Sequence, residues 1–351
     1  MSFSSSSYSS DTDSESENRR AFVSLEDYTS SVDSGSDSEE EKPEDDGKVM
    51  LLFYERLLID LREKYSVEDI DVRLSIQHLT TNYRQVCNGR LPSEIDYNNT
   101  RHCLGYLHRY AACHTFLVSE AVSAILNESD VLTSPLSKQT LNVVFLGGGP
   151  GNDFVGFLTA LHGKHEAIFD LDVTVVDKMS GWENVFNETV LKLRRGACCK
   201  AGYVFHDVIG SSMFITADLK ETGGWSDEME TKLRNADIVF LVKALSHIPN
   251  EDKKDVLQNI ISRTTLGTFL IYIDYPYPSG IFSELEYSLK LVYRSWRDSD
   301  ISTSQDPEKS LPRSALSTAT YGELAPALIL RWKTTISSSD CRTFKFPSLD
   351  K

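Results

Sequence analysis

Short segments rich in apolar residues alternate with helical patterns through the last two thirds of the chain. The apolar segments lie at residues 143–146, 171–176, 213–216, 237–242 and 268–273. Between them, apolar residues recur every three or four positions, which is the spacing of one helical face. Parallel strands joined by helical crossovers produce this alternation. The pattern therefore predicts an α/β fold with a doubly wound, mostly parallel sheet.

Two further strands are predicted near the C-terminus. Residues 328–335 and 341–346 are separated by the polar segment 336–340. Two strand-like segments with a short polar connection are typical of an antiparallel hairpin. Together with the five parallel strands, they predict a seven-stranded sheet that ends in a C-terminal antiparallel hairpin.

Residues 48–138, before the sheet, have a helical pattern. Apolar residues recur at helical spacing between positions 51 and 61, a second helix is predicted within 67–86, and a long helix is predicted from about 100 to 126. These helices have one apolar face each, and the block is too small to fold comfortably alone. It is predicted to be a helical cap that packs on a sheet domain formed by residues 139–351.

Residues 1–47 have a different composition from the rest. They contain many serines and hold 14 Asp and Glu against 3 Lys and Arg. Such a segment cannot bury enough apolar surface to offset its ordering entropy, which predicts a disordered acidic tail. A phosphorylated regulatory or localising segment and a simple solubilising extension are both compatible with it. The tail carries −11 of the net charge of −16, so the remaining −5 gives no general electrostatic argument for nucleic-acid binding.

Cysteine and histidine spacing argues against two classes of site. The six cysteines form no CxxC pair, and no cationic start precedes an apolar run, so reduced thiols of an intracellular protein, cytoplasmic or nuclear, are expected. His102, His108 and His114 are six residues apart and would be scattered around a helix, so no metal site is predicted. No apolar segment approaches the roughly 20 residues that cross a bilayer, and no membrane partner is expected.

A glycine-rich turn is the most distinctive segment of the chain. Residues 142–156 read NVVFLGGGPGNDFVG, which is a short apolar strand, a glycine turn and the start of a helix. Either Asn152 or Asp153 is predicted to cap that helix. Glycines let a ligand approach the backbone closely, and a helix start presents free N–H groups. This segment therefore predicts a nucleotide-binding unit of an α/β sheet.

Two phosphate-binding motifs do not fit this turn. A P-loop requires a glycine followed by lysine and serine or threonine, and nothing near Gly151 supplies them. A dinucleotide fold requires GxGxxG, but the sixth position is Asn152 when counted from Gly147 and Phe154 when counted from Gly149. The motif that does fit this turn is GxGxG, formed by Gly147, Gly149 and Gly151.

Two acids follow the GxGxG motif at the ends of later strands. Asp177 ends the second predicted strand, where a carboxylate can accept both hydroxyls of a ribose. Asp218 follows the third strand, where it can accept from the exocyclic amine of adenine. The set Gly147, Gly149, Gly151, Asp177 and Asp218 therefore predicts a nucleoside ligand.

This constellation resembles the class I, Rossmann-like S-adenosylmethionine-dependent methyltransferases. The resemblance implies S-adenosylmethionine as cofactor, with its amino-acid portion on the glycine turn, its ribose on Asp177 and its adenine near Asp218. Residues 237–249 and the closing hairpin fit the same family. One position departs from it, because Phe145 stands where the family usually has an acid. Backbone carbonyls of the turn or Asp153 are the available replacements for that acid.

Candidate catalytic residues follow strands four and five, where open α/β sheets bind their substrates. These are Lys243, His247 and Asp274. Asp274 or His247 can take a proton from a nitrogen or oxygen nucleophile, while a capping or loop-packing role is equally compatible with each. An inactive binding or scaffold protein with a methyltransferase fold is the alternative function.

A weaker resemblance concerns the methyl acceptor. Residues 97–121, with Arg101, Tyr106 and Tyr110, and the sequence IDYPYPSG at 273–280 are similar to fungal-type ribosomal-RNA uridine methyltransferases. The resemblance implies an RNA acceptor, although a protein or a small molecule stays open. An RNA acceptor would need basic residues that bind its phosphates. The predicted local phosphate track consists of Lys192, Arg194, Arg195, Lys200, Arg101 and Arg109.

Overall fold

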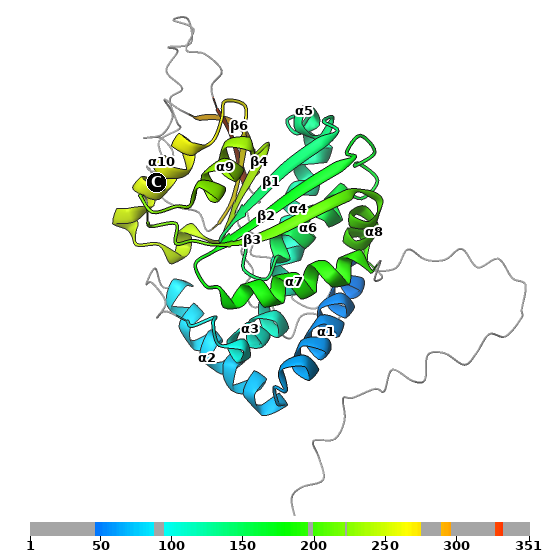
Figure 1. The fold of residues 1–351 in the computed structure, drawn as a ribbon, viewed down its shortest axis with the longest axis vertical. Coiled ribbons are helices and arrows are strands. Elements are labelled where there is room, and N and C mark those ends of the chain that lie inside the picture. The colour runs from blue at the N-terminus through cyan, green and yellow to red at the C-terminus, as the bar shows by residue number, and fades with distance from the viewer. Residues whose placement is uncertain are drawn as a thin grey trace, which may run out of the picture. The chain divides into compact units, whose positions relative to one another are not determined.

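A twisted sheet forms the centre of the structure, a computed structural model that describes residues 46–87, 95–195, 199–221, 223–274, 289–295 and 327–332 (Figure 1). Its strand order is β3-β2-β1-β4-β5-β7-β6. The strands are β1 (Thr140–Leu146), β2 (Asp170–Asp177), β3 (Ile209–Thr216), β4 (Ile238–Val242), β5 (Phe269–Ile273), β6 (Leu289–Ser295) and β7 (Ala327–Trp332). Strands β1 to β5 are parallel, which confirms the predicted α/β fold with a mostly parallel sheet.

The chain order of the strands reverses between β1 and β4. The first half of the sheet extends from β1 to β2 and β3, and the second half extends from β4 to β5. This reversal is the doubly wound arrangement, and ligands bind such sheets outside the carboxyl ends of the strands next to the reversal. The glycine turn follows β1, so it lies at this position.

The C-terminal part of the sheet differs from the predicted hairpin. Strand β7 overlaps the predicted segment 328–335 and pairs antiparallel with both β5 and β6. Strand β6 is not among the predicted strands. Residues 341–346, the second half of the predicted hairpin, lie outside the described residues, as do residues 1–45 of the predicted acidic tail. Those two parts of the prediction are therefore untested.

Helices cover both faces of the sheet (Figure 1). Helices α6 (Asn152–Leu161), α7 (Gly181–Arg194) and α8 (Lys200–Asp207) share one apolar cluster with Phe145 and Val143 of β1. Helices α9 (Asp227–Asn235) and α10 (Asn250–Arg263) share another with Val144 and Leu146. Successive side chains of a strand point to opposite faces, so the run 143–146 fills both layers.

The cap is helical, as predicted, and packs on the sheet domain. It consists of α1 (Asp46–Tyr65), α2 (Asp69–Cys87), α3 (Thr100–Tyr106), a π-helical turn (Leu107–Ala111), α4 (Ala112–Glu128) and α5 (Thr133–Leu136). Helix α4 crosses α6 at Gly156, where an added Cβ would lie 2.5 Å from the carbonyl oxygen of Thr115. The predicted single helix over 100–126 is interrupted by the π-helical turn, which sequence periodicity does not reveal.

Cap and sheet belong to one compact unit that starts at Glu44. The predicted domain boundary between residues 138 and 139 lies inside this unit and stays a prediction. In the described part of the chain, no helix combines the length and the apolar character that a membrane span requires.

Candidate cofactor and acceptor site

The glycine turn has the backbone that its sequence predicts. Gly147, Gly149 and Gly151 have φ angles of +72°, +48° and +86°. Residues other than glycine rarely adopt this left-handed region of φ. The backbone conformation of the turn therefore requires the alternate glycines of the GxGxG motif. Space is a second reason, because a Cβ on Gly147 would lie 2.8 Å from that of Ala244 and a Cβ on Gly151 would lie 2.8 Å from the ring of Phe186.

Helix α6 starts differently from the prediction. Its N-cap is Gly151, without a side-chain hydrogen bond, so the expected capping role of Asn152 or Asp153 is wrong. Gly151 has a left-handed backbone conformation and directs the chain into the helix, so Asn152 is the first helical residue. The N–H groups in the first turn of a helix have no partner within the helix. Here they lie directly after the glycine turn and can bind an anionic group of a ligand.

Asp177 is bonded directly to the glycine turn. Its Oδ2 accepts a hydrogen bond from the Gly149 N–H at 3.2 Å, and its Oδ1 accepts from the Met179 N–H at 3.0 Å. Burial raises the pKa of Asp177 to about 6, although the two backbone N–H groups and the charge of Lys178 oppose the shift. The structure therefore brings together the turn and the acid that the sequence predicts as its ribose-binding partner.

Asp153 is a second acid beside the turn. It is 4% exposed, and its Oδ1 accepts a hydrogen bond from the Asn152 side chain at 2.7 Å. Burial, and secondarily the charge of Asp177, raises the pKa of Asp153 well above its usual range. Two neighbouring buried carboxyl groups disfavour each other's ionisation, and a cation bound between them would relieve this.

Phe145 occupies the position of the family's usual acid because it belongs to the core. It is 0% exposed, and its ring stacks on that of Phe240 with centroids 4.8 Å apart. The rings of Phe154 and Phe157 in α6 complete the group. A carboxylate at position 145 would be surrounded by apolar rings. The nearby acid at the turn is Asp153, one of the two predicted replacements, the other being the backbone carbonyls of the turn.

Asp218 lies after β3, as predicted, and is partly exposed. Its Oδ1 accepts a hydrogen bond from the Lys220 N–H at 2.9 Å, and its carbonyl oxygen accepts from Trp225 Nε1 at 3.0 Å. The side chain therefore organises the turn that follows β3. No contact joins it to Asp177 in the described residues, so its role toward adenine stays a prediction.

Lys243 and His247 lie in the turn after β4. Lys243 has a φ angle of +52°, one of only two positive values among the described residues other than glycine. Such backbone strain costs about 1 kcal/mol or more and is concentrated at functional sites. Packing around the ring, and the positive charges of Lys178 and Lys243, lower the pKa of His247 below its ordinary value, while the side chain itself is exposed.

Asp274 has a position different from that of the other two candidates. It is 0% exposed, and its Oδ2 accepts a hydrogen bond from the Ser246 N–H at 3.1 Å. The Ser246 hydroxyl in turn donates to the Lys243 carbonyl oxygen at 2.6 Å. These bonds favour a role for Asp274 in holding the turn that carries Lys243 and His247.

Aromatic side chains of the cap and of α7 lie against this turn and the glycine turn. We call Tyr83, Tyr97, Tyr106, Tyr110 and Trp182 the aromatic cluster. The hydroxyls of Tyr83 and Tyr97 are 2.5 Å apart, and Tyr97 lies over Trp182 with ring centroids 4.5 Å apart. The indole of Trp182 lies 3.6 Å from the position of a Cβ on Gly149. The Tyr83 ring also contacts His247, with centroids 5.6 Å apart.

His114 of α4 is the cap residue next to Lys243 and His247. Its Nδ1 lies 2.8 Å from the Tyr106 hydroxyl. Burial and the charges of Lys243 and His247 lower the pKa of His114 to about 4. From sequence, His114 is interpreted as a packed residue of the helix over 100–126, and no site role is predicted for it. The signal that could have found it is its spacing of four and eight residues from Tyr110 and Tyr106, which places the three on one helical face.

The predicted phosphate track is only partly brought into the site. Its member Arg109 lies over the ring of Tyr110, with the guanidinium carbon 5.9 Å from the ring centroid. Lys192 pairs with Asp60, and Arg101 pairs with Asp71 at 3.0 Å, so these two members of the predicted phosphate track are occupied by acids. Arg194 donates to the Gly210 carbonyl oxygen at 2.8 Å. Within the described ranges, no group of three or more metal-binding side chains converges.

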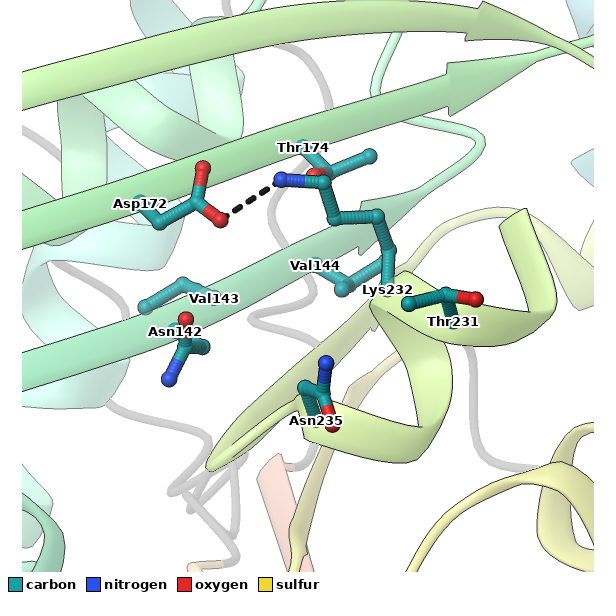
Figure 2. Close-up of a pocket in the computed structure, with 8 residues that line it drawn as sticks. All are labelled: Asn142, Val143, Val144, Asp172, Thr174, Thr231, Lys232 and Asn235. Atoms are coloured by element: carbon teal, nitrogen blue, oxygen red, sulfur yellow. Dashed lines mark hydrogen bonds and ion pairs between the residues drawn. The ribbon is translucent and has the colours of Figure 1, made fainter. Parts of the chain in front are cut away.

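A hollow of about 130 Å³ lies elsewhere on the sheet and is lined by residues of β1, β2 and α9. Figure 2 shows these lining side chains. The lining residues are Asn142, Val143, Val144, Asp172, Thr174, Thr231, Lys232 and Asn235. Lys232 donates to Asp172 at 2.6 Å, and Ser211 also donates to Asp172 at 2.8 Å. The hollow lies toward the amino ends of the strands, opposite the glycine turn, and its charges are already paired.

No protein-family model matches the chain, and no curated protein matches it. Among solved structures, the chain is similar to magnesium protoporphyrin IX methyltransferase from Synechocystis, at 12% identity over 75% of this chain and 97% of that chain, with a TM-score of 0.38. It is also similar to N-methyltransferase NodS from Bradyrhizobium japonicum (12% identity, 60% and 96% of the two chains, TM-score 0.33). A third similar structure is a methyltransferase from Leishmania major (9% identity, 79% and 91%, TM-score 0.37). These values are too low to carry an argument about ligand or activity.

Proposed function

We propose that this protein is an S-adenosylmethionine-dependent methyltransferase. The observation that carries the proposal is the hydrogen bond between the Asp177 carboxyl group and the N–H of Gly149, the middle glycine of the GxGxG turn. This contact joins an acid suited to ribose hydroxyls to a turn that a ligand can approach closely.

The residues around the turn fit the parts of the cofactor. Asp177 would hold the ribose, and Asp153 would accept from the ammonium of the amino-acid portion, in the role that an acid at position 145 has in the family. The first-turn N–H groups of α6 suit the carboxylate of that portion. Asp218 is assigned to the adenine. When bound, S-adenosylmethionine supplies an electrophilic methyl group to a nitrogen or oxygen atom.

The protein contributes position and desolvation to this chemistry. Lys243 and His247 are assigned to the acceptor side of the site, because they follow β4 next to the glycine turn. The acceptor loses a proton as its bond to the methyl group forms, and neutral His247 is the candidate to take it. Asp274 holds this turn by accepting a hydrogen bond from the Ser246 N–H.

RNA is the favoured acceptor, and this preference rests on the aromatic cluster. Single-stranded RNA is commonly recognised by stacking its bases on aromatic side chains. A protein or small-molecule acceptor would use the same cofactor site. A binding or scaffold protein that does not turn over is the second candidate, and the observation that favours it is Phe145 in place of the family's acid.

Calorimetric titration with S-adenosylmethionine tests cofactor binding. We expect binding by the wild type and a loss of about tenfold or more in affinity for Asp177→Ala, because a buried partner of polar groups is removed. Asp172→Ala is the matched control, since Asp172 lies near the opposite end of β2. Absence of binding by the wild type, or equal effects of both variants, would refute the assignment.

Transfer of labelled methyl groups distinguishes enzyme from scaffold. Wild-type protein is incubated with labelled S-adenosylmethionine and separated RNA, protein and metabolite fractions. Label in RNA supports the favoured acceptor, and label in another fraction replaces it. Binding of the cofactor without label in any fraction favours the scaffold.

A further inference from the structure

One asparagine of the cap joins it to the loop after β2. Asn98 lies in the cap segment before α3 and contacts residues 179–181, where β2 is connected to α7. Its Oδ1 accepts hydrogen bonds from the Gly181 N–H at 3.0 Å and from the Ser180 hydroxyl at 3.1 Å. Its Nδ2 donates to the sulfur of Met179 at 3.6 Å. A single side-chain amide therefore bonds to three successive residues of this loop.

Helix α7 obtains its N-terminal hydrogen-bond acceptor from this asparagine. The N-cap residue of α7 is Ser180, whose side chain makes no capping hydrogen bond because its hydroxyl donates to Asn98. The first N–H groups of a helix have no partner within the helix, and the side chain of the N-cap residue usually accepts from one of them. For the N–H of Gly181, the acceptor is instead Asn98, which lies 83 residues earlier in the chain.

The backbone of the cap segment also packs closely against the start of α7. A Cβ on Gly181 would lie 2.2 Å from the carbonyl oxygen of Tyr97 and 2.6 Å from the Cα of Asn98, so only glycine fits there. The Tyr97 ring lies over that of Trp182, with centroids 4.5 Å apart. The Asp96 carboxylate accepts from the Asn98 N–H at 3.0 Å and braces the segment. Polar and aromatic contacts together hold the loop against the cap.

This loop carries the acid that is proposed to bind the ribose. The Met179 N–H donates to Oδ1 of Asp177 at 3.0 Å, and the Gly149 N–H donates to Oδ2 at 3.2 Å. The backbone of Met179 thus orients the carboxylate, while its side chain lies against Asn98. A shift of the loop would change the direction in which Asp177 presents its oxygen atoms.

On the basis of the proposed cofactor site, we propose that Asn98 is a positioning residue of that site, which holds the loop after β2 so that the Asp177 carboxylate is oriented toward the ribose. Asn98 acts through Met179 and Asp177 and does not itself contact the cofactor. The cap segment thereby contributes to cofactor affinity. Docking of this segment and binding of the cofactor favour each other, because such coupling is reciprocal.

Calorimetry with S-adenosylmethionine and urea unfolding, both on the full chain, test this role. Asn98→Ala should weaken cofactor binding about fivefold to tenfold, because it removes hydrogen bonds that orient the carboxylate. Asn99→Ala is the matched control, since the Asn99 side chain caps α3 by accepting from the Arg101 N–H at 3.0 Å. Both variants should unfold at lower urea concentration than the wild type, but Asn99→Ala should leave cofactor affinity unchanged.

The titration of Asp177 in the free protein is a readout that a purely structural role of Asn98 would not change. The Met179 N–H lowers the pKa of Asp177, so Asn98→Ala should raise this pKa above the wild-type value of about 6. Carbon-13 NMR of labelled aspartate measures the pKa, and Asp177→Asn identifies the signal. The substitution leaves in place the other titratable groups that act on Asp177, which are Lys178, Asp153, Cys103, Tyr83 and Tyr106.

Gly181→Ala separates the cap segment from the loop by a second route, because its Cβ would meet the Tyr97 carbonyl oxygen. It should also weaken cofactor binding and raise the pKa of Asp177, and it decides the question if Asn98→Ala does not fold. Equal cofactor affinities of Asn98→Ala and Asn99→Ala, or an unchanged pKa of Asp177 in Asn98→Ala, would overturn the positioning role. Failure of the wild type to bind S-adenosylmethionine would refute the proposed function, while the NMR titration would still decide this inference.

Discussion

The affinity for S-adenosylmethionine should depend on pH through Asp177. Its carboxyl group contacts the N–H groups of Gly149 and Met179, and burial raises its pKa to about 6. Ribose hydroxyls donate hydrogen bonds to an ionised carboxylate, which accepts at both oxygens. We therefore expect the ionised form of Asp177 to be the form that binds the cofactor.

The size of this effect follows from the pKa. With a pKa of about 6, roughly nine tenths of the protein carries ionised Asp177 at pH 7 and roughly one tenth does at pH 5. If only this form binds, the dissociation constant rises about tenfold between pH 7 and pH 5. Above pH 7 the affinity should be nearly constant.

Folding stability should change in the opposite direction. The pKa of Asp177 is raised from 3.8 to about 6, so the folded chain retains its proton over a range in which the unfolded chain has lost it. The contribution of Asp177 to stability is thus fully present below pH 4 and is lost as the pH rises to about 6, by up to about 3 kcal/mol. Cofactor binding would offset this loss.

Calorimetry from pH 5 to pH 8 measures the first effect, and urea unfolding from about pH 3.5 to pH 7, the range that contains both pKa values of Asp177, measures the second. Asp177→Asn is the control, because its amide cannot ionise. We expect it to bind more weakly than the wild type at pH 7 and to lose the tenfold dependence on pH. A wild-type affinity that stays level between pH 5 and pH 7 would refute the ionised carboxylate as the ribose partner.

Three further substitutions test separate parts of the structure. Lys243→Gly should raise the free energy of unfolding by about 1 kcal/mol, because glycine relieves the left-handed backbone, and should reduce the rate of methyl transfer. Ser66→Gly, at the other positive φ angle, should give a similar gain in stability without that loss of activity. Equal rates of methyl transfer for Lys243→Gly and the wild type would contradict a role for Lys243. Phe145→Ala should lower the free energy of unfolding by about 3 to 5 kcal/mol in urea titration, and a loss below about 1 kcal/mol would contradict its core position. Tyr54→Phe removes the 2.6 Å hydrogen bond to Thr115 and should cost about 1 kcal/mol in the same measurement, with no loss expected if the bond is not formed in solution.

The parallel sheet and the glycine turn could be predicted from sequence because their signals are local. An apolar run of strand length and three alternate glycines restrict the backbone within a few residues, and Gly147, Gly149 and Gly151 have the positive φ angles that such a turn requires. Asp177 follows from the same logic, because a strand end in a parallel sheet lies next to the turn of its neighbour.

The parts of the site that the sequence did not predict depend on contacts between distant segments. In the sequence, Trp182 is only one apolar residue of a predicted amphipathic helix. Its contacts with Gly149 and Tyr97 depend on how distant segments pack in the fold. The position of His114 near Lys243 and His247 depends on how α4 crosses α6. Strand β6 was missed because its alternation of apolar and polar residues is short and its partner β7 is distant in sequence.

The interlocking of cap and sheet has a consequence for synthesis of the chain. The Thr115 hydroxyl accepts a hydrogen bond from the Tyr54 hydroxyl and donates one to the carbonyl oxygen of Asn152, and the Thr115 carbonyl packs against Gly156. During translation α1 and α4 leave the ribosome before α6 and α7, so their apolar faces stay uncovered until the later helices are made.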